Sequence, residues 1–108
     1  MAAKKTTTKK QKMYVIVRCK DAGVHAGTLE KQTKEHLVLS DTRRIWYWNG
    51  AASLSEIARF GLNPQKSTSS KISAAVRSNQ LRQTDVCEVL ECSPEGEASI
   101  VGAPVWRA

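Results

Sequence analysis

The sequence lacks the features that mark most membrane proteins and many enzymes. Its 108 residues contain no apolar run that approaches the roughly 20 residues needed by a membrane-spanning helix. The basic N-terminus is not followed by an apolar stretch, so we expect neither a secretory signal nor a membrane partner. A glycine-rich phosphate loop, a nucleophile elbow and a metal-ligand helix are also absent from the sequence. These absences favour a binding protein over an enzyme, and we expect no catalytic residues.

Cysteine and histidine are scarce, which limits metal and redox chemistry. The three cysteines are an odd number and predict reduced thiols in a cytoplasm. Cys87 and Cys92 lack the CxxC spacing and a second ligand pair, which argues against a zinc site. The five acidic residues between positions 85 and 97 are more typical of a solvated strand edge and a helix start than of a cation site. We therefore expect no metal and no cofactor.

Positive charge is abundant but concentrated at the N-terminus. Five lysines precede Met13 with no acid among them, and the rest of the chain holds 12 basic and 10 acidic residues. The composition of residues 1–12 predicts a disordered basic tail, and residues 13–108 are expected to form a single domain. The tail suits either a nucleic-acid contact driven by counterion release or a merely solubilising role. Within the domain, residues 59–82 carry five bases and no acid, while 85–97 carry five acids and no base.

The hydrophobic pattern indicates an α+β fold. We predict strands at 13–19, 28–32, 36–40 and 43–48, with a glycine-containing loop at 21–27 and a turn at Asp41–Thr42. Two further strands are expected at 71–76 and 85–92. Short polar turns between short strands favour a small antiparallel sheet or a partly closed barrel.

One or two short helices complete this prediction. Ser53 and Glu56 form a capping box, and Gly61 provides a stop for the helix. Ser93 followed by Pro94 is a second helix start. The final PVW at 104–106 is expected to pack back on the domain.

The stretch RRIWYWNGAASLSE at 43–56 is the main candidate for a ligand site. In a strand, Arg44, Trp46 and Trp48 share one face, while Arg43, Ile45 and Tyr47 share the other. Nucleobases stack on indoles, and the planar guanidinium fork suits phosphate. The alternative interpretation is that the tryptophans form part of the core and the arginines stack on them at the surface.

The helix start after this strand adds backbone N–H groups that attract anions. His25, in a loop between two glycines, is a base, a ligand contact or simply polar surface. The predicted ligand-binding residues are Arg43, Arg44, Trp46, Trp48, Asn49, Ser53, Ser55 and His25.

The motifs AGVHAG, RRIWYWNGAASLS and PVW resemble a small family of uncharacterised proteins from tailed bacteriophages and prophages. Its members share AGVxAG, RRIWYWxGAASLS and a C-terminal PVW. The resemblance implies a phage protein that acts in the host bacterial cytoplasm. Small non-enzymatic phage proteins often antagonise host defence, and one such mode is the sequestration of nucleotide signals.

Three functions are compatible with these features. The first is an inhibitor of host defence that sequesters a nucleotide second messenger, so that the partner is a small anionic nucleotide. The second is a DNA- or RNA-binding accessory protein that uses the lysine tail. The third is a phage structural or protein-interaction subunit whose tryptophans form an interface. A domain of this size has little room to bury its aromatic residues, so we expect a homo-oligomer.

Overall fold

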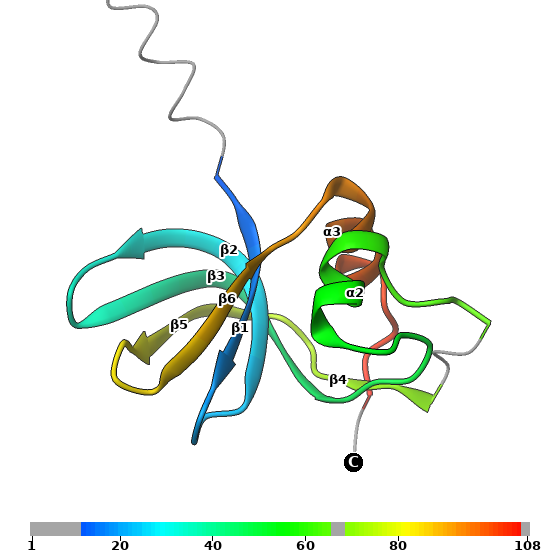
Figure 1. Cartoon of the computed structure of the whole chain (residues 1–108), viewed down its shortest axis with the longest axis horizontal. Coiled ribbons are helices and arrows are strands. Elements are labelled where there is room, and N and C mark those ends of the chain that lie inside the picture. Colours follow the sequence, from blue (N-terminus) through cyan, green and yellow to red (C-terminus); the bar gives the residue numbers. More distant parts are fainter. Residues whose placement is uncertain (1–11, 66–68, 107–108) are drawn as a thin grey trace, which may run out of the picture.

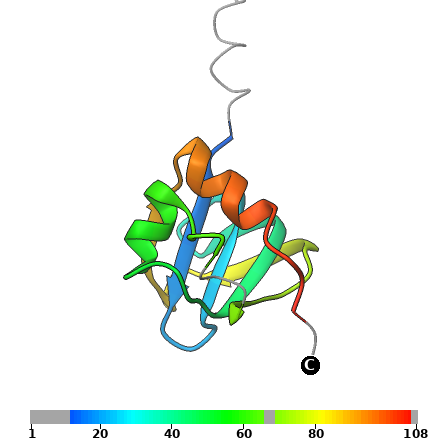
Figure 2. The same ribbon diagram turned by 90° about the vertical axis from the view of Figure 1, so that its right-hand side faces the viewer.

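The protein has an α+β fold, an open antiparallel sheet of six strands with two short helices on one of its faces (Figures 1 and 2). The computed structural model describes residues 12–65 and 69–106. The predicted basic tail lies outside the described residues except for Lys12, which pairs with Glu30. None of the described helices is long and apolar enough to cross a membrane.

The strands are β1 (Tyr14–Cys19), β2 (Val24–Gln32), β3 (His36–Tyr47), β4 (Lys71–Ile72), β5 (Val76–Arg82) and β6 (Val86–Glu91). Their order is β4–β3–β2–β1–β6, and β5 pairs with the first part of β3. All of these pairings are antiparallel. The long strand β3 therefore lies at the centre of these pairings, with β2 on one side and β5 and β4 on the other.

The predicted turn at Asp41–Thr42 is wrong, because the third and fourth predicted strands are one continuous strand. Asp41 has a φ of 49°, and the pairing register with β2 shifts opposite it, between Ala26 and Thr28. This is a bulge, which bends a strand without ending it. Aspartate tolerates the left-handed conformation better than most residues. The residue that suggested a turn in the sequence therefore forms a bulge in the structure.

The predicted loop at 21–27 is also wrong in its second half, because β2 begins at Val24. Gly23, with a φ of 88°, makes the turn between β1 and β2. Gly27 lies inside β2, where an added Cβ would stand 2.9 Å from the carbonyl oxygen of Ser40. This second glycine therefore permits a close approach of β3 and does not form a bend.

The predicted strand at 71–76 is in fact two elements, β4 and the start of β5. The prediction missed most of β5 because its sequence, VRSNQLR, is polar and Leu81 is its one buried residue. The predicted strand at 85–92 is confirmed as β6.

Both predicted helix starts are confirmed. The helix α2 (Leu54–Phe60) begins where the Ser53 hydroxyl accepts a hydrogen bond from the Glu56 N–H at 3.2 Å. It ends at Gly61, whose φ is 82°. The helix α3 (Pro94–Val101) is capped in the same way by Ser93.

The sheet buries side chains on both faces. One cluster lies between the sheet and the two helices and contains Tyr14, Ile16, Ala26, Ile45, Leu54, Ile57, Ala58, Leu62, Ile72 and Ile100. The other contains Val15, Val17, Cys19, Leu37, Leu39 and Leu81. Alternate residues of β1 enter alternate clusters, as the two-residue period of a strand requires.

Candidate functional site

The two neighbouring arginines of β3 occupy opposite environments. Arg43 is only 5% exposed. Its Nε donates to the Ser73 carbonyl at 2.6 Å, and its Nη1 donates to the carbonyls of Ile100 and Ala103, each at 2.7 Å. Burial lowers the pKa of Arg43, yet a guanidinium in a protein remains a cation.

The carbonyls around Arg43 explain how this cation is stabilised without a carboxylate. Ile100 lies in the last turn of α3, where carbonyls lack helical partners and the helix dipole is negative. Arg43 thus joins β3 to the end of α3 and to the segment that follows. Since its guanidinium is committed to backbone groups, we leave Arg43 out of the candidate site.

Arg44 and Trp46 are exposed on the other side of β3, as the alternation predicts. Trp46 is 61% exposed. The two residues line two adjoining hollows of about 240 and 300 Å³. The smaller hollow is completed by His25, Thr42, Ser73, Val76 and Asn79, and the larger by Ala22, Gly23, Val24, Ile45 and Trp48.

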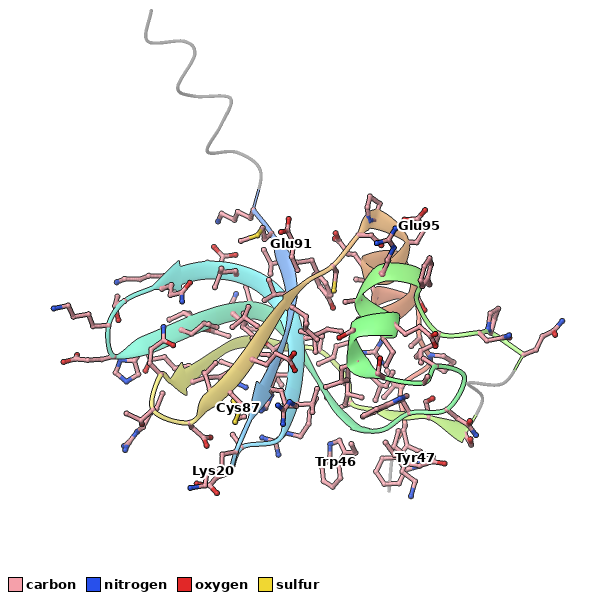
Figure 3. The ribbon with its side chains drawn as sticks, viewed as in Figure 1. Lys20, Trp46, Tyr47, Cys87, Glu91 and Glu95 are labelled. Carbon is pink, nitrogen blue, oxygen red and sulfur yellow. The ribbon has the colours of Figure 1, made fainter. Side chains whose placement is uncertain are left out.

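The C-terminal segment adds a second indole to this side. The ring centroid of Trp106 lies 6.0 Å from that of Trp46, with an interplanar angle of 47°. The Lys71 ammonium lies 5.0 Å from the Trp106 ring centroid, within cation–π range. Figure 3 shows Trp46 and Tyr47 projecting beyond the ribbon at the end of β3. We call Arg44, Trp46, Lys71 and Trp106 the Trp46 surface.

Lys71 and Trp106 were not predicted from the sequence as members of this surface. The predicted packing of the PVW segment on the domain is confirmed by a hydrogen bond from the Trp106 N–H to the Ile72 carbonyl at 2.9 Å. The position of Trp106 beside Trp46 depends on a contact between segments 60 residues apart in sequence. A lysine directly before a buried isoleucine carries no local signal for this role.

Trp48 lies beyond the end of β3 and has a mixed environment. It is half-buried and packs against the helix-side cluster, yet it also lines the larger hollow with Arg44 and Trp46. The three residues that the alternation placed on one face therefore do meet. Trp48 lines the hollow and packs on the core, whereas Trp46 is mostly exposed and lies beside Trp106.

His25 is a strand residue and not the loop residue that we predicted. It is 2% exposed and forms part of the smaller hollow. Its Nε2 lies 2.9 Å from the Ala22 carbonyl, and its Nδ1 lies 3.3 Å from the Asn79 amide nitrogen. An amide nitrogen only donates, so Nδ1 accepts and Nε2 carries the proton. Burial lowers the pKa of His25, which keeps the ring neutral near pH 7.

A second polar group lies in the same hollow. Among the described residues, the hydroxyl of Thr42 is buried without a hydrogen-bond partner. The lining of this hollow is mainly apolar and includes no acidic residue, while Arg44 supplies positive charge at its side.

The helix start does not join this surface. Ser53 uses its hydroxyl as the cap, and the Glu56 carboxylate accepts from the Ala52 N–H at 2.6 Å. A carboxylate thus already occupies the position that a phosphate would take. Asn49 donates from its backbone and side chain to Ser70 and Ser69, which organises the loop. Ser53, Ser55 and Asn49 line neither hollow.

All three cysteines are free, and two of them, Cys19 and Cys92, are poorly placed for reaction. Burial, followed by the nearby Glu97 and Glu91, raises the pKa of Cys92 to about 12, and burial also raises the pKa of Cys19. Thiols of this kind stay protonated at neutral pH and are weak nucleophiles. In the part of the chain that the structure describes, no group of three His, Cys, Asp or Glu side chains is placed to hold a metal.

The chain belongs to a family defined by a domain of unknown function (DUF6948), whose model matches residues 12–100. The match includes every strand and nearly all of α3, and therefore Arg44, Trp46 and Lys71. Trp106 lies beyond the matched residues. No curated protein and no solved structure matches the chain.

Proposed function

We propose that the chain is a non-enzymatic protein that binds a small anionic nucleotide on the Trp46 surface. The observation that carries the proposal is the exposure of Trp46, 61% of which faces solvent beside the exposed Arg44. A large exposed aromatic residue gains little from packing in the free protein. Exposed aromatic patches next to arginine are typical of binding surfaces.

The chemistry of the surface suits the two parts of a nucleotide. A base stacked on an indole gains roughly 1–3 kcal/mol. The guanidinium of Arg44 offers a planar pair of donors for phosphate, and Lys71 offers a second cation nearby. The hollows of about 240 and 300 Å³ share Arg44 and Trp46, so together they fall in the size range of small-ligand sites.

The buried His25 of the smaller hollow supports binding over catalysis. Both ring nitrogens of His25 are engaged with protein groups, so the ring is not free to act as a general base. The half-buried Asn79 is the neutral polar side chain of this hollow that is best placed to contact a base.

The biological role that we propose follows from the resemblance to phage proteins. In this role the protein acts in the cytoplasm of an infected bacterium and sequesters a nucleotide second messenger made by a defence system. The role requires tight binding without turnover, in agreement with a neutral His25 whose two ring nitrogens are both hydrogen-bonded to protein groups.

Single-stranded nucleic acid is the second candidate ligand. Unpaired bases stack on exposed indoles in the same way, and the net charge of +7 favours a polyanion. The two ligands differ in salt dependence, because a polynucleotide releases many counterions and a mononucleotide few.

Calorimetric titration of matched variants tests the proposal. Arg44→Lys and Trp46→Leu are titrated with a panel of linear and cyclic nucleotides and a short single-stranded oligonucleotide. Arg59→Lys and Phe60→Leu are the controls, because Arg59 lies 5.3 Å from the ring centroid of the exposed Phe60, on α2 and away from the hollows. We expect about tenfold weaker nucleotide binding for each site variant and unchanged binding for the controls.

Three results would redirect or remove the proposal. No heat with any nucleotide, or equal affinities in all four variants, excludes the Trp46 surface as a nucleotide site. Binding of the oligonucleotide alone, with a steep loss of affinity as salt rises, selects the second candidate. Loss of self-association in Trp46→Leu without any nucleotide binding identifies the surface as a subunit contact.

A further inference from the structure

The open sheet leaves two strand edges unpaired. Within the described residues, β5 pairs with β3 and β6 pairs with β1, and neither has a second partner. A short turn at 83–85 joins β5 to β6, but the two strands diverge from it and form no ladder with each other (Figure 1). Each edge therefore presents backbone N–H and C=O groups to which another strand can bind.

The two edge strands carry opposite charge. Arg77 and Arg82 are exposed on β5, which contains no acid. Glu88 and Glu91 lie on β6, which contains no base. Glu88 also forms an exposed ion pair with Arg18 of the neighbouring strand, at 3.2 Å. The charge separation seen along the sequence therefore survives folding as a basic edge and an acidic edge.

We propose that the β5 edge of one copy of the chain pairs with the β6 edge of a second copy. Pairing of two β5 edges would place arginines together, and pairing of two β6 edges would place glutamates together, so both like pairings are disfavoured. Only the mixed pairing brings opposite charges across the contact. The strands also match in length, with seven residues in β5 and six in β6.

One antiparallel register satisfies both charge and side-chain direction. If Arg77 stands opposite Glu91, then Arg82 is diagonal to Glu88, within reach of a long side chain. The same register places Asn79 opposite Val89.

The contact is head-to-tail, so a pair keeps one free edge of each charge, the acidic edge on one copy and the basic edge on the other. Such contacts close into rings or extend into chains. None of the four charged residues lines the hollows beside Trp46, so this inference stands apart from the proposed function.

Edge-specific variants test the inference by sedimentation velocity. The variant R77E/R82E blocks the basic edge, and E88K/E91K blocks the acidic edge. We expect wild-type protein to associate at tens of micromolar and to dissociate as salt rises. Each variant alone should associate roughly tenfold more weakly or worse. An equimolar mixture of the two variants should recover association, because both edges of one variant are acidic and both edges of the other are basic.

Control variants separate edge pairing from a change in net charge or in folding. Lys31→Glu reverses an exposed charge on β2, away from both edge strands, and should associate as wild type does. If E88K/E91K has a lowered melting temperature, Glu91→Lys alone retains the Arg18–Glu88 pair and should still weaken association. A monomeric wild type, edge variants that associate like wild type, or a mixture that stays monomeric would each overturn the inference.

Discussion

Arg43 and Arg44 are adjacent in sequence and identical in chemistry, yet one supports the fold and the other faces solvent. Arg43 points to the helix side of the sheet, where backbone carbonyls from three segments surround it. Arg44 points to the hollow side, where its guanidinium is exposed beside Trp46. The comparison shows that charge type alone does not mark a binding residue; the hydrogen-bonding capacity left free after folding does.

The same contrast extends to the aromatic residues on the two sides. On the helix side, Tyr14 is buried, and burial, with a smaller effect of Cys92, raises its pKa to about 12. On the hollow side, Trp46 retains most of its surface for contact with solvent or a ligand. Substitutions on the helix side should therefore affect stability, and those on the hollow side should affect binding.

The largest effect that we expect comes from Arg43. Arg43→Met leaves the carbonyls of Ser73, Ile100 and Ala103 without their donor and should lower the free energy of unfolding by about 3 kcal/mol or more. Arg44→Met should change it by no more than about 0.5 kcal/mol. Urea denaturation measures both, and equal effects of the two substitutions would contradict the assignment of opposite roles.

The tryptophans should show a smaller contrast of the same kind. Trp48→Ala removes a half-buried indole from the helix-side cluster and should cost roughly 2 kcal/mol, less than for a fully buried tryptophan. Trp46→Ala should cost less than about 1 kcal/mol, yet weaken nucleotide binding more than Trp48→Ala does. Melting curves and titrations of the two variants test this. The reverse order in either measurement would contradict a packing role for Trp48 and a ligand-contact role for Trp46.

The smallest effect that we expect is a pH dependence from His25. Burial holds the folded-state pKa of His25 below its ordinary value of 6.5, so the unfolded chain takes up the proton first as pH falls. The contribution of neutral His25 is therefore fully present above about pH 6.5 and is lost as pH falls below it. Melting temperature measured from about pH 7.5 to 5 should decline in wild type.

Two variants assign this decline to one histidine. His25→Gln should flatten the curve, because an amide keeps a donor and an acceptor but does not titrate. His36→Gln changes the other histidine, which is half-exposed on β3, and should leave the decline in place. An unchanged slope in His25→Gln would show that other groups cause the pH dependence.

Much of the local structure could be predicted from the sequence. Ser53, Glu56 and Gly61 set the bounds of α2, and Ser93 with Pro94 set the start of α3, because caps act through bonds between residues three or four positions apart. The alternation of β3 also placed Arg44 and Trp46 on one side. These predictions held because each depends only on neighbouring residues.

The tertiary structure decided which of these residues have free functional groups. Arg43 became structural because Ser73 and the end of α3 meet it, and His25 became a neutral, buried residue because Asn79 of β5 lies against it. Trp106 reached Trp46 because the segment after α3 pairs with Ile72. Asp41 bends β3 without ending it, because the pairings with β2 and β5 continue past the bulge. Each outcome depends on partners at least 30 residues away or on other strands, and a local pattern carries no record of which distant groups meet.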